Sequence, residues 1–92
     1  MIASFAHKGL ERFYRTGDTR GIQAKHAERL QRILDALDAA GRPDDMDLPG
    51  YALHRLEPRR LSLYAVKVSG NWRVSFRFTD GNAEIVNYLD YY

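Results

Sequence analysis

The chain of 92 residues has no cysteine and no long apolar run, and these two absences exclude several classes of protein. Without cysteine there is no disulfide framework and no thiolate metal site. No stretch approaches the roughly 20 apolar residues that span a bilayer, and the N-terminus has no basic-then-apolar signal segment. We therefore expect a cytoplasmic protein that does not associate with membranes.

Histidine is also scarce. The three histidines, His7, His26 and His54, are far apart in the sequence, and none has a carboxylate at metal-ligand spacing. A zinc site would have to be assembled from scattered parts of the chain. We expect a protein that uses neither a metal nor another cofactor.

The length is that of one small domain covering residues 1–92, because a chain of this size buries only roughly 60–65% of its unfolded surface. The acidic segment 42–50 is therefore a connector within that domain. The net charge is only +2, but 11 of the 14 basic residues are arginine, the side chain best shaped for bidentate phosphate contact. A small net charge can still conceal a basic face.

Two helices are predicted in the first half of the chain. Residues 2–6 are a short strand candidate, and a helix around Phe13 follows, with Gly17 as its C-cap. From Ile22 to Gly41, apolar residues recur at helical spacing, which predicts an amphipathic second helix. Its charges, including those of Lys25-His26 and Glu28-Arg29, are interpreted as a solvated face.

The second half reads as strands over residues 51–56 and 61–68, followed by a C-terminal hairpin. Apolar and polar residues alternate from Trp72 to Thr79, and Asp80-Gly81 offers a tight two-residue turn. Regular alternation through both turns predicts one apolar face, formed by Leu61, Leu63, Ala65, Trp72, Val74, Phe76, Ile85 and Leu89. The same alternation predicts an opposite face formed by Arg60, Ser62, Tyr64, Arg73, Ser75, Arg77, Tyr88, Asp90 and Tyr92.

The helices need an apolar surface to cover, and the face of Trp72 and Phe76 is the only large one. The sequence thus predicts an α+β domain in which an antiparallel sheet is backed by both N-terminal helices on one face. The opposite face stays open. The Arg77–Glu84 pair there reads as ordinary cross-strand decoration.

The other residues of the open face have two interpretations, a solvated surface or a nucleic-acid-binding surface. Arg60 and Arg73 beside Tyr64, Tyr88 and Asp90 would combine phosphate clamps with stacking planes. His54 likewise is either structural or a proton shuttle, since its ordinary pKa is close to neutrality.

Several segments resemble HigB-type toxins of the RelE/ParE superfamily. They are Leu-His-Arg-Leu at 53–56, Asn-Trp-Arg-Val-Ser-Phe at 71–76, Asn-Ala-Glu-Ile-Val-Asn-Tyr-Leu-Asp-Tyr at 82–91, and the opening at 2–10. The resemblance spans essentially the whole chain. It implies a RelE-like fold with a curved antiparallel sheet, and a ribosome-dependent endoribonuclease that cuts mRNA in the A site, next to 16S rRNA. It also implies neutralisation by a HigA-type antitoxin and chemistry without metal.

The resemblance also assigns roles to residues. In the catalytic role it implies Arg73, Arg60, His54, Asp90 and Tyr91. In RNA binding it implies Lys67. The chemistry of the side chains adds Arg59 as a cation and Tyr64, Tyr88 and Tyr92 as stacking rings to the predicted RNA-binding residues. The implied reaction is attack of a ribose 2′-OH on the adjacent phosphate, which needs a base, an acid and cations.

Two positions depart from the family pattern. Glu57 stands where active members usually have lysine, and Tyr92 stands where they end in histidine. Glutamate repels phosphate, and tyrosine is a poorer proton shuttle at neutral pH, with a reference pKa of about 10. The alternative to the enzyme is therefore a non-catalytic protein on the same fold, either a gyrase-directed toxin or a degenerate toxin that retains antitoxin or ribosome binding.

Overall fold

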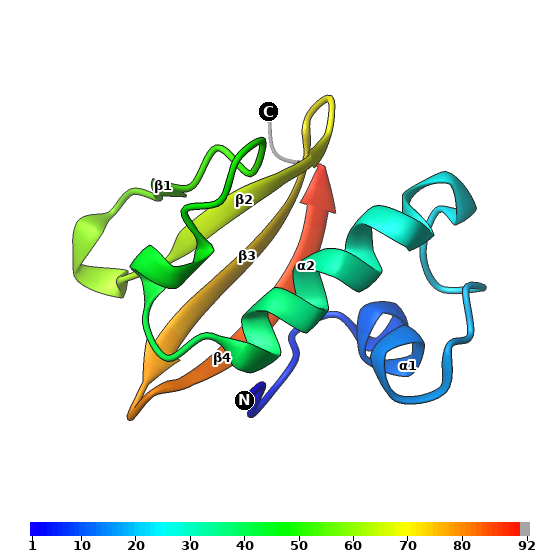
Figure 1. Ribbon diagram of the computed structural model, residues 1–92, viewed down its shortest axis with the longest axis horizontal. Coiled ribbons are helices and arrows are strands. Elements are labelled where there is room, and N and C mark those ends of the chain that lie inside the picture. Colours follow the sequence, from blue (N-terminus) through cyan, green and yellow to red (C-terminus); the bar gives the residue numbers. More distant parts are fainter. Residues whose placement is uncertain (91–92) are drawn as a thin grey trace.

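The computed structural model describes residues 1–90, and it contains two helices and a four-stranded antiparallel sheet of order β1-β2-β3-β4 (Figure 1). The elements are α1 (Lys8–Thr16), α2 (Ala27–Ala39), β1 (His54–Arg55), β2 (Tyr64–Ser69), β3 (Trp72–Thr79) and β4 (Asn82–Asp90), with short 3₁₀ helices η1 (Ala24–His26), η2 (Pro43–Met46) and η3 (Arg59–Leu61). No helix within the described residues is both long and apolar enough to cross a bilayer.

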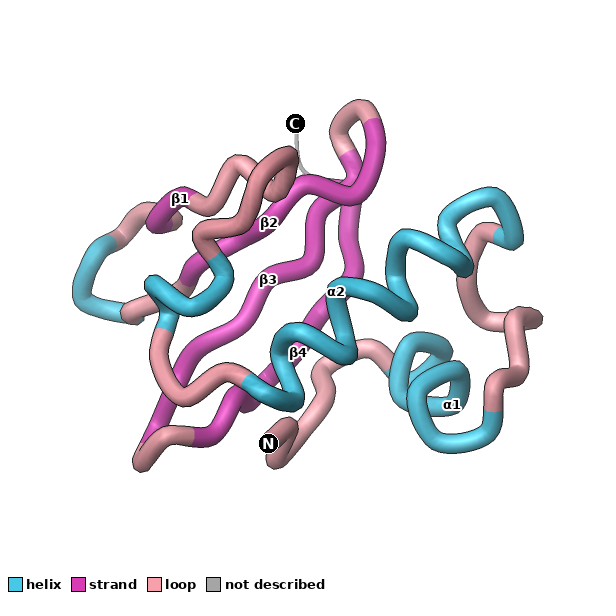
Figure 2. The backbone as a smooth tube through the Cα atoms, in the orientation of Figure 1, coloured by secondary structure: helices cyan, strands magenta, loops and turns pink. Residues whose placement is uncertain are grey.

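Helix α2 lies across one face of the open, twisted sheet, and α1 lies beside it, next to β4 (Figure 2). The core lies between the helices and the sheet, where the apolar side chains of both helices join those of the strands in one cluster. Its fully buried members include Leu10, Leu30, Ile33, Leu34, Leu37, Val66, Val74, Phe76 and Val86. The predicted α+β architecture, with the helices on one side, is confirmed.

The boundaries of the helices follow from local chemistry. His7 Nδ1 accepts a hydrogen bond from the backbone N–H of Leu10 at 3.0 Å, which caps the start of α1. Gly17 ends α1 with φ +79°, as the C-cap prediction required. The second helix begins later than predicted, since η1 precedes α2, and it ends just before Gly41.

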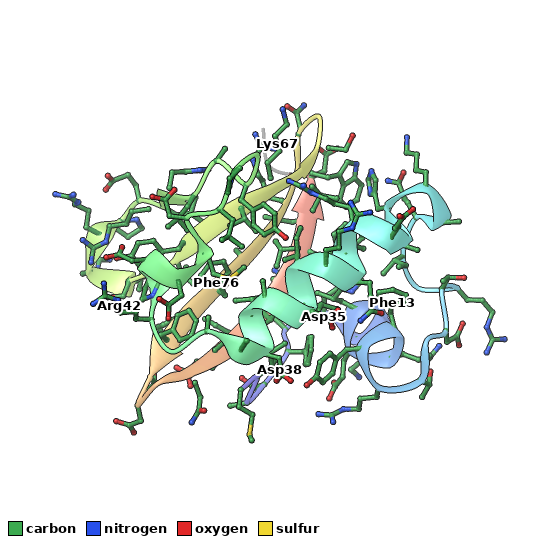
Figure 3. The ribbon with its side chains drawn as sticks, viewed as in Figure 1. Phe13, Asp35, Asp38, Arg42, Lys67 and Phe76 are labelled. Atoms are coloured by element: carbon green, nitrogen blue, oxygen red, sulfur yellow. The ribbon has the colours of Figure 1, made fainter. Side chains whose placement is uncertain are left out.

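The N-terminal segment, residues 1–6, lies parallel to β4. Two isolated bridges, Ile2 to Ala83 and Phe5 to Val86, join the segments. Asp38 of α2, labelled in Figure 3, accepts a hydrogen bond from the backbone N–H of Ile2 at 3.1 Å. The strand predicted at residues 2–6 is therefore an extended segment that borders the sheet.

Two β-bulges break the alternation on which the predicted faces depended. In β2, Ser69 pairs with Trp72 but Lys67 pairs with Arg73, so Val68 is an extra residue. In β4 the pairing shifts between Glu84 and Asn87, where Ile85 adopts φ +47°. Because strand side chains alternate, one extra residue transfers every later side chain to the opposite face.

Because of the two bulges, five residues lie on the face of the sheet opposite to the predicted one. The registers put Ala65 and Leu89 on the face of Arg73, and they put Tyr64, Tyr88 and Asp90 on the face of Trp72. These five predictions were wrong for one reason: the alternation of apolar and polar residues in the sequence does not reveal an extra residue in a strand. The placements of Trp72, Val74, Phe76, Arg73, Ser75 and Arg77, all in β3, are confirmed.

The strands before the hairpin are also shorter than predicted. Only His54 and Arg55 of the segment 51–56 form a strand, and Ala52 has φ +50°, a left-handed conformation that interrupts an extended chain. Residues 59–61 form η3 instead of the start of a strand. Leu61, predicted on the apolar face, is therefore 41% exposed.

Candidate functional site

Several basic side chains lie on the open face of the sheet, and we call three of them, His54, Lys67 and Arg73, the basic triad. Lys67 pairs directly with Arg73, while His54 pairs with Ala65, two residues before Lys67 on the same face. Neighbouring strands are about 4.8 Å apart and residues rise about 3.3 Å, so the Cα atoms of His54 and Arg73 are about 12 Å apart. Three long side chains can therefore converge on one phosphodiester group.

The triad lies near the β2–β3 hairpin, on the face that the helices leave uncovered (Figure 1). Figure 3 shows Lys67 at that end of the sheet and the carboxylates of Asp35 and Asp38 along α2. Acidic side chains of α2 and the basic triad thus belong to different layers of the molecule.

His54 is exposed, and its ring is oriented by its own backbone. Nδ1 lies 3.1 Å from the carbonyl oxygen of Ala52. A carbonyl only accepts hydrogen bonds, so Nδ1 carries the proton in the neutral ring and Nε2 keeps its lone pair. This tautomer leaves Nε2 free to accept a proton.

Arg73 is half-buried and is held at the hairpin. Its Nη1 donates to the carbonyl oxygens of Gly70 at 2.6 Å and Trp72 at 3.0 Å. A guanidinium has five N–H donors, so donors remain for a phosphate. Burial of part of the side chain fixes its position at the edge of the open face.

Arg77, on the same face of β3, has a different environment. Its Nε donates to Glu84 Oε1 at 2.8 Å, and the hydroxyl of Thr79 donates to the same oxygen at 2.8 Å. Hydrogen bonds from Thr79 and Arg77 lower the pKa of Glu84. The predicted Arg77–Glu84 cross-strand pair is confirmed, and its charges offset each other.

Other predicted site residues lie apart from the triad. Arg59 and Arg60 are exposed in η3, which precedes β2, whereas the hairpin that holds Arg73 follows β2. Asp90 is exposed at the end of β4, opposite Trp72 and next to the residue that pairs with Arg73. Tyr91 and Tyr92 lie outside the described residues.

Tyr64 and Tyr88 do not provide stacking planes beside Arg73, contrary to the prediction. Tyr88 is 4% exposed, and its hydroxyl lies 2.6 Å from His26 Nδ1. Its ring centroid is 4.6 Å from that of Trp72. Tyr64 stacks on Phe76 with centroids 6.4 Å apart, on the helix-covered face.

His26 is a buried polar residue that the sequence interpretation missed. It is 3% exposed, and burial, with a smaller effect of Lys25, lowers its pKa. The signal was present, because His26 falls on the helical stripe of Leu30, Ile33 and Leu37. Burial also raises the pKa of its partner Tyr88. No cluster of three potential metal ligands occurs within residues 1–90.

Residues 3–92 match the family of RelE-like toxins of the type II toxin–antitoxin system HigB. The chain belongs to this HigB family. It is also 38% identical to the Endoribonuclease HigB of Proteus vulgaris over 92 residues, which cover the full length of both chains. The HigB resemblance is thereby confirmed, and membership of a toxin–antitoxin family implies a cognate antitoxin as partner. The non-catalytic alternative is not favoured.

Proposed function

We propose that this HigB-family toxin is a metal-independent endoribonuclease that cleaves mRNA in the ribosomal A site. The observation that carries the proposal is the basic triad, whose three members the strand registers and the bulge of β2 place on one face away from the helices. A full-length relative that is named an endoribonuclease supports the same chemistry. The site of action would be the cytoplasm, and the antitoxin would be of the HigA type.

In the proposed reaction, a ribose 2′-oxygen forms a bond to the adjacent phosphorus and the bond from phosphorus to the 5′-oxygen breaks. Nε2 of His54 accepts the 2′-proton. Arg73 and Lys67 stabilise the negative charge that develops on the phosphorane. The products are a 2′,3′-cyclic phosphate and a 5′-hydroxyl.

The leaving 5′-oxygen needs a proton, and we assign this step to the end of the chain. Tyr91 would donate it, with Asp90 orienting that side chain, as the family positions imply. Arg59 and Arg60 lie at the far end of β2 from the hairpin, so we assign them to the RNA backbone or 16S rRNA and not to the scissile phosphate. Tyr92 would stack on a base.

The decisive experiment is primer extension on a reporter mRNA after induction of the toxin, with Arg73→Ala and Arg77→Ala as a matched pair. Both arginines lie on the open face of β3, but only Arg77 is paired with a carboxylate. We expect discrete in-frame cuts for the wild type and for Arg77→Ala. Loss of one charge-stabilising donor should lower cleavage by Arg73→Ala about 10²- to 10³-fold.

Thermal melting of Arg73→Ala should stay close to that of the wild type, because its side chain lies outside the core. Full cleavage by Arg73→Ala would show that the open face is not the active site. A wild-type protein that blocks growth without cutting mRNA would favour the non-catalytic alternative instead.

A further inference from the structure

Arg29 of α2 reaches two separate segments with one nitrogen. Its Nη2 donates to the carbonyl oxygen of Gly50 at 2.8 Å and to that of Lys67 at 2.9 Å. The guanidinium carbon lies 4.6 Å from the centroid of the Tyr51 ring. A helix residue on the covered face thus fixes both β2 and the loop before β1.

These two segments carry the basic triad. The backbone N–H of Lys67 donates to the carbonyl oxygen of Tyr51 at 2.7 Å, so the loop runs beside β2 at that residue. The carbonyl of Ala52, next in the chain, contacts the ring of His54. Arg29 therefore binds, from the helix-covered side, the backbone segments whose side chains Lys67 and His54 lie on the open face.

The Lys67 carbonyl needs such a partner. In an antiparallel pair, the N–H and C=O of one residue point to the same neighbouring strand. For Lys67 that side is the β1 edge, but β1 pairs only with Tyr64 and Ala65. The guanidinium of Arg29 takes the place of a strand donor at the residue just before the Val68 bulge.

The contacts of Arg29 are not all favourable to stability. Its Nε is buried without a hydrogen-bond partner among the described residues, and an unpaired buried donor is unfavourable. A lysine ammonium could donate to both carbonyls from one nitrogen, but it lacks the guanidinium plane that lies over the Tyr51 ring and fixes the direction of approach.

We propose that Arg29 is a positioning residue that sets the bulge of β2 and thereby aims Lys67 at the RNA phosphate. This inference rests on the proposed function, because Lys67 must contact RNA for its aim to matter. Arg29 itself touches no substrate, since it lies on the helix-covered side.

The test compares Arg29→Met and Arg29→Lys with Arg32→Met, a control on the same helix. Arg32 is exposed, and within residues 1–90 its side chain pairs with Glu28 at 2.8 Å and with no residue of the sheet, so its loss removes the same charge without disturbing β2. We expect single-turnover cleavage of ribosome-bound mRNA to fall about tenfold in Arg29→Met, partly in Arg29→Lys, and not in Arg32→Met. In a Lys67→Ala background, Arg29→Met should add little.

The salt dependence of RNA binding separates aiming from simple unfolding. Loss of one phosphate contact should reduce the slope of log K against log salt by about 0.7 for single-stranded RNA. We expect that change in both Lys67→Ala and Arg29→Met, whereas a smaller folded fraction alters amplitude and not slope. If Arg29→Met unfolds, Arg29→Lys carries the same measurement.

Two results would overturn the positioning role of Arg29. One is a salt dependence of RNA binding like that of the wild type in both Arg29 variants, and the other is a loss of cleavage on Arg29→Met that is as large in the Lys67→Ala background as in the wild type. A wild-type toxin that binds RNA but does not cleave it would refute the proposed enzyme. The slopes would then still decide whether Arg29 aims Lys67.

Discussion

Glu57 places a negative charge in the loop between β1 and η3, close in sequence to Arg59 and Arg60. Replacing it with lysine exchanges a repulsive charge for an attractive one beside the RNA backbone. We expect Glu57→Lys to raise mRNA cleavage on ribosomes and to steepen the salt dependence of RNA binding by about 0.7 or more. Glu57→Gln, which only removes the anion, should give a smaller gain.

Two arginines of the same loop could make the charge at position 57 unimportant for RNA binding. If Arg59 and Arg60 already satisfy the RNA backbone, Glu57→Lys should do little and the double change Arg59→Ala with Arg60→Ala should silence the toxin. Unchanged cleavage in all these variants would remove the loop from the RNA-binding surface.

Single residues also show what the sequence could and could not reveal. Motif positions identified His54, Lys67 and Arg73, and the structure brings these three together on one face. The prediction for Tyr88 was wrong because the bulge at Ile85 turns Tyr88 to the buried face. The residues around Ile85 give no sign of this bulge in the sequence. The partner of Tyr88 is also His26, 62 residues away.

At the scale of elements, the bulge in β4 can be tested through the strained residue that forms it. Ile85 has φ +47°, a conformation that costs a β-branched residue roughly 1–2 kcal/mol. Glycine relieves that strain but loosens the unfolded chain, so we expect the free energy of unfolding of Ile85→Gly to stay within about 1 kcal/mol of wild type. Urea denaturation measures it.

Val86 provides the control, since it is the next residue and is 0% exposed. Val86→Gly removes a core side chain from a residue without a positive φ and should lose more than about 2 kcal/mol. Equal losses in both variants would mean that Ile85 is not strained, and the assigned register of β4 would need revision.

The helices were more predictable than the strands, for a physical reason. The apolar stripe and the Gly17 cap are local signals, so α1 and the C-terminal end of α2 fall where they were expected. Strand length depends on partners far away in the chain. The segment 51–56 lost most of its strand because Ala52 turns left-handed and Tyr51 turns into the core.

At the scale of the whole molecule, two histidines couple stability to pH. Burial lowers the pKa of both His7 and His26 below the ordinary value of 6.5. In the unfolded chain these two histidines are therefore protonated near pH 6.5, whereas in the folded protein they are protonated only at a lower pH. Stability is fully present above 6.5 and falls as the pH drops toward the folded pKa values.

Thermal melting between pH 7.5 and pH 5.5 tests this coupling. We expect the melting temperature to fall with acidification, by roughly 4–8 °C for each kcal/mol lost. His26→Gln should flatten the profile. Two other shifted groups lie outside this range: Arg20 lowers the pKa of Asp18 to about 2, and burial raises the pKa of Tyr88 from its ordinary value of 10. A melting temperature that rises on acidification would contradict the assignment.

The N-terminal segment beside β4 has a consequence for how this toxin meets other proteins. Its backbone exchanges hydrogen bonds with Ala83 and Val86, so the outer side of β4 is occupied over residues 83–86. At the other edge, β1 is only two residues long. Long unpaired edges invite strand addition and fibril-like aggregation, and short or covered edges prevent it. We therefore expect an antitoxin to recognise this toxin mainly by side chains and surface shape, because the described sheet offers only short unpaired edges for a shared strand.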